Sequence, residues 1–373
     1  MNPERAKLAE RYEFFQNVFF LLDYIVLGLF LFILLIGGKG SLSLSVWHKT
    51  VEAVNGNFWL STLLFIFLVQ IAYQLITFPY TYAKDYRLEK IFGLSNQTFG
   101  GWLWDLVKST VLTTLLLLAA LLFCYAMMRY LGEWWFLAAG AGWICLQIIL
   151  GMLFPVVILP LFYKSEEIKE HPCKERLIGL LESTGLKVTG LYRLDLSEKT
   201  KKANAMLCGL GSTRRVMMSD ALLEYPEDEI IAIMAHEVGH YKRRHIWKLA
   251  ALHAALIMLG LFLLSKVLAL YCAKAGIDYS AAGSYPVFLL FFSLWQLVTM
   301  PITNGFSRKC ETEADLFALQ STGLGSAFAS ALRRLAEGNL AVLNVPRIIE
   351  IFLYSHPATG KRIRMAENWE GKL

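Results

Sequence analysis

Six long runs of apolar residues dominate the hydrophobic pattern of this chain. A helix needs about 20 consecutive apolar residues to cross a bilayer. The runs cover residues 15–38, 58–80, 111–128, 134–162, 246–270 and 285–302. The pattern therefore predicts a mainly α-helical, polytopic membrane protein with about six transmembrane helices.

Polar stretches follow the fourth and the sixth apolar runs. Residues 166–184 are charged and have a helical period, whereas residues 188–196 alternate between apolar and polar like a short strand. Residues 204–209 and 215–219 indicate two further strands around a glycine-rich turn at 209–212. We therefore expect a small β-sheet outside the membrane.

Composition and charge agree with a membrane protein. Hydrophobic residues make up 56% of the chain and charged residues only 18%, which is too apolar for an ordinary soluble domain. The net charge of +6 is modest, and the basic residues cluster outside the apolar runs. The positive charge therefore indicates how the protein is oriented in the membrane rather than binding to nucleic acid. The N-terminus is too polar for a cleavable signal peptide, so we expect the first run to remain as a span.

Lysine and arginine alternate in density from one loop to the next. Residues 5–11 and 84–90 are rich in basic residues, and the loops after the first, third and fifth runs are poor in them. By the positive-inside rule, both termini, residues 164–245 and the tail after residue 302 are expected on the cytoplasmic side. Asp23 and His253 lie within apolar runs, where they either line a polar cavity or pair within the bundle.

A helix carrying His236, Glu237 and His240 in the order H-E-x-x-H is predicted after Pro226. Residues four apart share a helical face, so the two imidazoles can converge on one ion while Glu237 reaches the water-filled fourth position. Zinc lowers the pKa of that water, and Glu237 can take its proton. The five-residue pattern also arises by chance, but the acidic residues at 227–229 and the apolar face support the helix. We therefore predict one zinc ion per chain.

Such a site needs a third protein ligand, usually a carboxylate on a later helix. Glu311 and Asp315 are four apart after the sixth run, so Glu311 can ligate zinc while Asp315 hydrogen-bonds a ligating histidine. Glu313 points elsewhere on the same helix. An acidic patch of this kind is otherwise usually solvated.

The strand that begins near Asn204, Ala205 and Met206 can hold a substrate. An exposed edge strand pairs with an extended peptide through backbone hydrogen bonds and can hold a scissile bond over the metal. The alternative is that these strands only cover the zinc helix. The expected organisation is a membrane domain with four spans (1–163), a cytoplasmic catalytic domain (164–245), two spans (246–304) and a C-terminal catalytic segment (305–373).

Several separated segments of the chain resemble the integral-membrane zinc CAAX prenyl protease family of type I, which includes the a-factor-converting and prelamin A-processing enzymes. The matching segments include T-F-P-Y at 77–80, E-K-I-F-G-L-S-N-Q-T at 89–98, P-L-F-Y-K at 160–164, N-A-M at 204–206, H-E-V-G-H-Y-K at 236–242 with His245, A-D-L-F-A at 314–318 and Y-S-H-P at 354–357. The chain lacks the additional N-terminal span and the insertion common in eukaryotic members. It therefore resembles a shorter, bacterial-type member.

This resemblance implies zinc on His236, His240 and Glu311, Glu237 as the general base and Asp315 beside the metal. It also implies a substrate strand near Asn204, and His356 and Arg362 near the reacting carbonyl. An imidazole or guanidinium there can stabilise the oxyanion of amide hydrolysis.

The function expected from these features is that of a membrane-embedded zinc metalloendopeptidase. It would cut peptide bonds near the cytoplasmic surface of a bacterial inner membrane, or of the endoplasmic reticulum in a eukaryote. The substrate would be a peptide or protein, with or without a lipid modification. The alternative enzyme is a quality-control zinc protease of the heat-shock type. A non-catalytic scaffold predicts loss of the base, whereas Glu237 is present, and a transporter gives no reason for the zinc motif.

Overall fold

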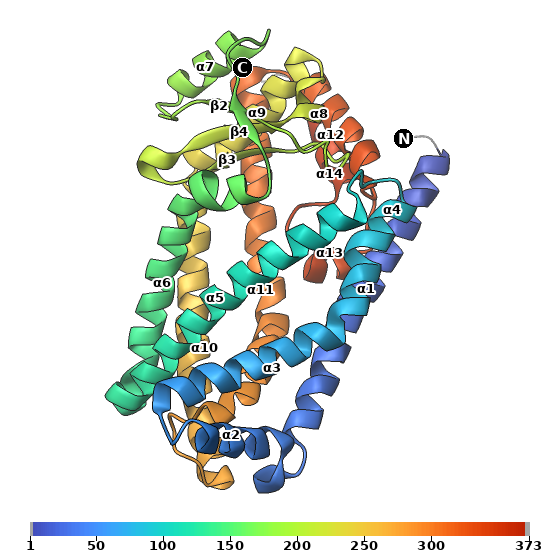
Figure 1. Cartoon of the computed structure of the whole chain (residues 1–373). Helices are drawn as coiled ribbons and strands as arrows, with labels where there is room; N and C mark the ends of the chain where they lie inside the picture. Colours follow the sequence, from blue (N-terminus) through green and yellow to red (C-terminus); the bar gives the residue numbers. More distant parts are fainter. Residues whose placement is uncertain (1–2, 370–373) are drawn as a thin grey trace.

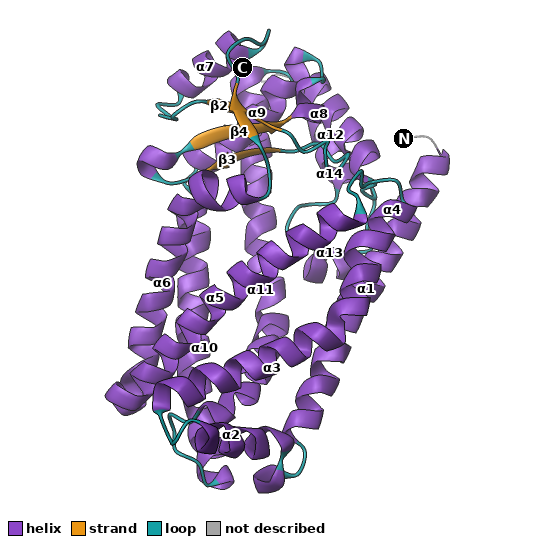
Figure 2. Cartoon of the chain, viewed as in Figure 1, coloured by secondary structure: helices purple, strands orange, loops and turns teal. Residues whose placement is uncertain are grey.

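The structure, a computed structural model that describes residues 3–369, consists of a bundle of long helices with a small sheet and most of the shorter helices at one end (Figure 1). Among the described residues, strands occur only at that end (Figure 2). The ends of the expected domains, residues 1–2 and 370–373, lie outside the described residues. The long helices are α1 (Pro3–Leu35), α3 (Phe58–Thr81), α5 (Phe99–Leu131), α6 (Trp135–Leu153), α10 (His245–Ala275) and α11 (Tyr285–Thr322).

Within the described chain, five helical segments are long and apolar enough to cross a membrane. They are Pro3–Leu35, Phe58–Ile91, Phe99–Leu161, His245–Ala275 and Ala282–Thr322. The third segment contains both α5 and α6, joined by the short turn η3 (Gly132–Trp134). The predicted multi-pass membrane protein is therefore confirmed, while the number of six spans stays a prediction.

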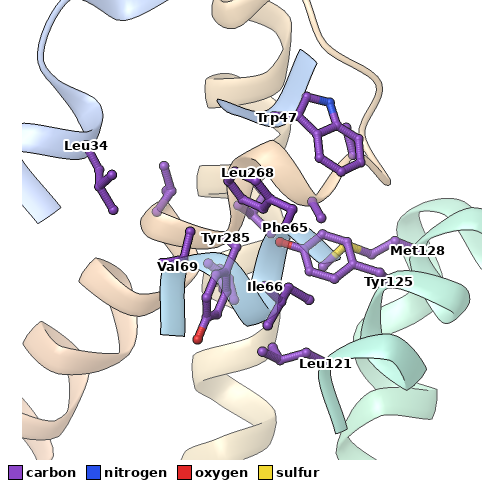
Figure 3. Packing of buried hydrophobic residues seen from close by; sticks show 14 of the residues in the cluster. Leu34, Trp47, Phe65, Ile66, Val69, Leu121, Tyr125, Met128, Leu268 and Tyr285 are labelled. Carbon is purple, nitrogen blue, oxygen red and sulfur yellow. The ribbon is translucent and has the colours of Figure 1, made fainter. Parts of the chain in front are cut away.

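The helical bundle exposes apolar side chains outward and packs others inside. Leu21, Leu75 and Leu270 are more than 60% exposed, as suits contact with lipid. Away from the sheet, Phe65, Tyr125 and other large side chains form a buried core between α3, α5, α10 and α11 (Figure 3). Between α1 and the segments around Asn339 and Tyr354, Asp23 lies 2.6 Å from Lys84, and both residues border a cavity of about 410 Å³. Asp23 therefore both pairs and lines a cavity.

The sheet has four strands in the order β1-β2-β4-β3. These are β1 (Ser165–Glu167), β2 (Leu191–Leu194), β3 (Ala205–Cys208) and β4 (Arg215–Ser219). β2 and β4 run parallel, and the outer pairs are antiparallel. β3 therefore has a free edge, as expected for the strand near Asn204.

The first polar segment differs from the prediction. Residues 166–184 were expected to be helical, but β1 occupies the start and α7 covers only Lys174–Ser183. Pro172 lies between them, and a proline disfavours helical geometry in the residue before it. β1 itself forms by pairing with β2, a long-range contact that local periodicity does not reveal.

The remaining short helices are α2 (Leu42–Ala53), α4 (Glu89–Ile91), α8 (Asp220–Leu223), α9 (Glu227–Lys242), α12 (Gly325–Asn339), α13 (Arg347–Leu353) and α14 (Thr359–Glu367).

α9 and α11 pack closely where they cross, at Gly239. A Cβ atom built on Gly239 would lie 3.1 Å from Ala314 Cα, so a larger residue here would push the two helices apart. At 1.5 Å per residue, the 38 residues of α11 extend about 57 Å, well beyond a hydrocarbon layer of about 30 Å. The helix that includes the sixth apolar run therefore extends out of the membrane and reaches the region where it packs against α9. It also crosses the expected domain boundary at residue 304.

Candidate metal centre

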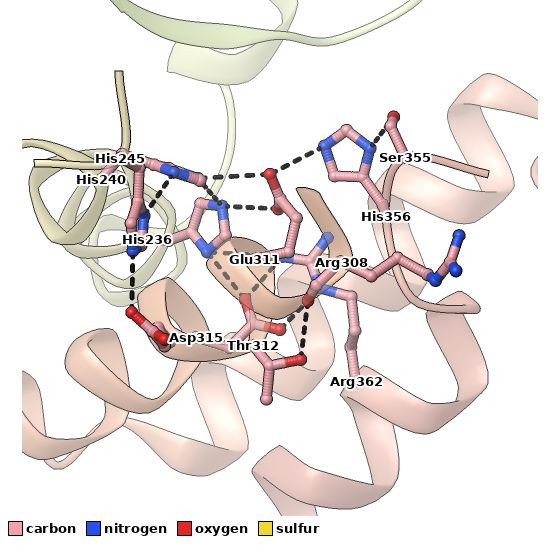
Figure 4. A network of polar contacts seen from close by, with 11 residues as sticks. His236, His240, His245, Arg308, Glu311, Thr312, Asp315, Ser355, His356 and Arg362 are labelled. Carbon is pink, nitrogen blue, oxygen red and sulfur yellow. Dashed lines mark hydrogen bonds and ion pairs between the residues drawn. The ribbon is translucent and has the colours of Figure 1, made fainter. Parts of the chain in front are cut away.

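His236 and His240 of α9 converge with Glu311 of α11 (Figure 4). His236 Nε2 lies 3.1 Å from His240 Nε2 and 3.2 Å from Glu311 Oε2, and His240 Nε2 lies 3.3 Å from Glu311 Oε1. In a tetrahedral zinc site with bonds of about 2.0–2.1 Å, neighbouring ligand atoms are about 3.3 Å apart. These separations therefore fit one ion of this size.

The state of the Glu311 carboxylate also fits a cation. Its Oε2 atom is buried and has no hydrogen-bond partner. An unsatisfied buried carboxylate oxygen is costly, whereas a metal ion would satisfy it. Two imidazole nitrogens and one carboxylate form the His₂Glu set of catalytic zinc sites, which leaves a fourth position open.

Asp315, one turn after Glu311, fixes the ring of His236. Its Oδ1 atom lies 2.7 Å from His236 Nδ1, on the opposite side of the ring from the metal-facing Nε2. Arg362 of α14 donates two hydrogen bonds to the same carboxylate, from Nη2 to Oδ1 at 2.6 Å and from Nε to Oδ2 at 2.8 Å. Asp315 is therefore held in place and orients His236 with Nε2 toward the ion.

Glu237 lies between the candidate ligands and the sheet. It lines a cavity of about 200 Å³ that also includes His236, His356 and Arg362. Burial raises the pKa of the Glu237 carboxyl, and the neighbouring histidines and a hydrogen bond with the backbone of Leu207 offset part of that rise. Leu207 belongs to β3, so the candidate base lies beside the free edge of the sheet.

The predicted substrate residues lie at the start of β3. Asn204 exchanges hydrogen bonds with Ser219: the backbone N–H of Asn204 donates to Ser219 Oγ, and that of Ser219 donates to the carbonyl of Asn204, both at 2.9 Å. The antiparallel alternation then directs the backbone groups of Ala205 and Leu207 toward the free edge. Asn204 and Ala205 line the 200 Å³ cavity, whereas Met206 packs with the buried cluster around Leu194.

His356 approaches the centre from the loop between α13 and α14. Its side chain is 57% exposed, and Nε2 lies 3.4 Å from Glu311 Oε1. The guanidinium of Arg362 is buried, with Nη2 3.5 Å from His236 Nδ1. The structure thus brings both residues to the centre. His356 lines the cavity, with Nδ1 3.0 Å from Ser355 Oγ, while Arg362 is engaged with Asp315.

The model of peptidase family M48 matches residues 167–370, which is more than half of the chain. The chain belongs to peptidase family M48. A second model, described as the CAAX prenyl protease N-terminal region with five membrane helices, matches residues 1–164. This M48 member is thus a multi-pass integral membrane metalloprotease that acts on peptide bonds, and its family implies a bound metal.

Relatives of this M48 member occur in bacteria and eukaryotes. An uncharacterized metalloprotease, YhfN of Bacillus subtilis, is 27% identical over 377 residues, covering 99% of this chain and 87% of the relative. A CAAX prenyl protease 1 homolog of Arabidopsis thaliana is 27% identical over 327 residues, covering 84% and 75%. The crystal structure of S. mikatae Ste24p superimposes with a TM-score of 0.81 at 22% identity, over 98% of this chain and 89% of that chain, which establishes the shared fold.

One contact of this M48 centre was missed from the sequence, because Glu313 was expected to point away. His240 Nδ1 lies 3.0 Å from Nδ1 of the buried His245, whose Nε2 lies 3.1 Å from Glu313 Oε2. Glu313 therefore faces away from the ion but supports His240 through His245. The position of His245 at the first residue of α10, five after His240, was the available signal.

The loop that carries His356 is held by contacts that the sequence did not reveal. Arg308 Nη1 donates to the carbonyls of Glu350 and Tyr354, at 2.7 and 2.6 Å. Burial would raise the pKa of Glu350, but hydrogen bonds from Lys361 and from the backbone of Ala358 hold it below its ordinary value. These contacts fix both ends of the loop around His356.

Proposed function

We propose that this M48 member is a zinc endopeptidase that cuts peptide bonds at the cytoplasmic membrane surface, with prenylated C-terminal CAAX motifs as its substrate class. One zinc ion per chain is bound by His236, His240 and Glu311. The observation that carries the proposal is the convergence of these three ligands, at separations of 3.1–3.3 Å, beside Glu237 and a free sheet edge. Relatives named CAAX prenyl protease 1, such as the one in Arabidopsis thaliana, support the substrate class.

The residues of the chain divide the reaction between them. Zinc, when bound, supplies a Lewis acid that lowers the pKa of water and polarises a carbonyl. Glu237 removes the proton from the attacking water and returns it to the leaving amine. His356 stabilises the negative charge on the carbonyl oxygen. The positive charge of Arg362 adds to this stabilisation, and its guanidinium also holds Asp315 in place. Asp315 and His245 keep the two imidazoles in the required tautomers.

The substrate is held as an added strand. The outward-facing backbone groups of Ala205 and the carbonyl of Leu207 pair with an extended peptide that runs antiparallel to β3, while the N–H of Leu207 donates to Glu237. Because backbone groups make these bonds, the strand itself selects little for side chains. The small cavity of about 200 Å³ at the Asn204 end fits the few residues that follow the scissile bond.

The topology follows from charge. Six spans with both termini inside keep the basic loops and the metal centre on the cytoplasmic side, and a bacterial inner membrane is the proposed location. Cysteines introduced at Lys201 and Lys361 should react with an impermeant thiol reagent only from the cytoplasmic side. A cysteine at Asp278 should react only from the opposite side, and labelling of positions 201 and 278 from one side would refute the topology.

The substrate class is tested with purified protein in lipid nanodiscs. A farnesylated CAAX peptide, the same peptide without farnesyl and an unprenylated, unfolded membrane protein are incubated with the wild type and with Glu237→Gln. Selective cleavage of the farnesylated peptide by the wild type supports the proposal. Cleavage of the unfolded protein alone would instead favour the quality-control alternative. Zinc analysis of the wild type and Glu311→Ala tests the ligand set, since undiminished zinc in the variant would refute it.

A further inference from the structure

A second, larger cavity lies at the other end of β3 from the Asn204 cavity. Its volume is about 590 Å³. It is lined by Leu207 of β3 and by Gly209, which directly follows the strand. His240 lines this cavity, whereas His236 lines the smaller one. The two cavities therefore flank the metal centre along the direction in which a paired peptide would run.

The larger cavity is lined by cations without a counter-charge. Arg214, Lys242 and Arg244 contribute three positive charges, and none of its lining residues among positions 3–369 carries a carboxylate. Over the same range, no salt bridge engages any of the three. A cavity lined by one sign of charge attracts the opposite charge.

One of these cations is held in place by its neighbours. The guanidinium of Arg214 lies 4.7 Å from the centre of the Tyr241 ring, and Nη1 donates to the carbonyl of Lys187 at 3.3 Å. Arg214 is only partly exposed, while Lys242 and Arg244 are exposed at the turn between α9 and α10. The cavity therefore has one ordered cation and two that can adjust to a ligand.

We propose that this cavity is a substrate subsite for an acidic side chain upstream of the scissile bond. The inference rests on the proposed peptidase function and on antiparallel binding to β3, which places the N-terminal part of the peptide at the Gly209 end. Gly209 lies two residues beyond Leu207, beside which the base is located, and paired strands advance together at about 3.3 Å per residue. The acidic residue is therefore about two to four positions upstream.

The rival occupant of this cavity is the headgroup of an anionic phospholipid. An apolar cavity of about 460 Å³ between α6 and α10 shares Leu207, Gly209, Leu210, Ile246 and Trp247 with it. The peptide is favoured because His240 and the free edge of β3 line the cationic cavity itself. The two occupants are separated by the lipid composition in the test.

The test uses one cleavable parent peptide with glutamate, glutamine or lysine at each of the positions two to four residues upstream of the cut. In zwitterionic nanodiscs at low salt, we expect kcat/KM to fall from glutamate to glutamine to lysine at one of these positions. The expected difference between glutamate and lysine is at least about tenfold, and it should shrink as salt is added.

Two variants locate that preference. Lys242→Gln combined with Arg244→Gln should reduce the preference to about twofold or less, and these exposed positions carry little risk to folding. Arg214→Glu combined with Lys242→Glu should reverse it, with the lysine peptide cut faster than the glutamate peptide. Arg243→Gln is the matched control, because Arg243 lies in the same turn and does not line the cavity.

Four results would overturn the subsite. Cleavage of all the peptides at equal rates, or a charge preference that is unchanged in both variants, removes it while leaving the peptidase function intact. Inhibition by added phosphatidylglycerol that disappears in the Lys242→Gln, Arg244→Gln variant assigns the cavity to lipid. If no peptide is cut by zinc-loaded wild type, the peptidase function fails first, and the subsite with it.

Discussion

Replacement of Gly239 by alanine is expected to weaken zinc binding without unfolding the protein, because this residue sets the distance between α9 and α11. A Cβ atom there would lie 3.1 Å from Ala314 Cα and 3.2 Å from the Ala314 carbonyl oxygen. Non-bonded carbon atoms pack at about 3.5–4.0 Å, so the helices must separate by about 0.5 Å. The Phe317 ring, also 3.1 Å away, can rotate, but the backbone of Ala314 cannot.

The same separation moves Glu311 away from His236 and His240. Ligand atoms that are 3.2 and 3.3 Å apart would then be about 0.5 Å further apart, whereas zinc sites tolerate deviations of about 0.2 Å in bond length. We expect zinc affinity to fall by about 10- to 100-fold, as when ligand orientation is disturbed. Overpacking costs about 1–3 kcal/mol of stability, and the higher helix propensity of alanine returns up to about 1 kcal/mol.

Competition between the metal-free protein and a chromophoric chelator measures this effect directly, and thermal unfolding with and without zinc measures stability. Gly179→Ala is the matched control, since Gly179 also lies within a helix but a Cβ there would meet nothing within 4 Å. It should leave zinc affinity unchanged and raise stability slightly. Wild-type zinc affinity in Gly239→Ala would refute the idea that this contact sets the ligand geometry.

Three further outcomes are expected. Glu237→Gln should retain zinc but lose about 10²- to 10⁴-fold in turnover, because Glu237 is a base and not a ligand; loss of the metal together with activity would contradict that role. His356→Ala should lower kcat more than it raises KM, because the oxyanion exists only along the reaction path, and a change in KM alone would make His356 a binding residue. The Glu350 carboxyl has a lowered pKa in the folded protein, so its contribution to stability is complete above the unfolded pKa of about 4.3 and is lost as pH falls through the folded pKa. Melting temperatures of wild type and Glu350→Gln should therefore differ near pH 7 and converge toward pH 3, and a constant difference would show that Lys361 and Ala358 do not stabilise the ionised form.

The sequence predicted the membrane protein, the zinc helix and the later acidic helix because each depends on local spacing. An apolar run of bilayer length leaves no alternative to a helix, and the four-residue separations of His236 from His240 and of Glu311 from Asp315 place each pair on one face. The positions of His356 and Arg362 came from the family resemblance rather than from spacing. The structure brings both beside the metal centre.

The missed features depend on contacts between distant segments. β1 exists because it pairs with β2, and the support that Glu313 gives to His240 depends on where α10 begins. Arg308 reaches the loop around His356 over more than 40 residues of sequence. Helical period described the direction of the Glu313 side chain correctly but could not reveal what lies in that direction.

The single helix α11, with Pro301 inside it, joins the lipid-facing part of the protein to Glu311 of the candidate metal centre. Each residue added to or removed from α11 between Tyr285 and Glu311 would turn the carboxylate by about 100° and shift it by about 1.5 Å along the axis. A single insertion would therefore point Glu311 away from α9 altogether. A bilayer that changes the tilt of α11 would likewise move Glu311, near its far end, relative to α9.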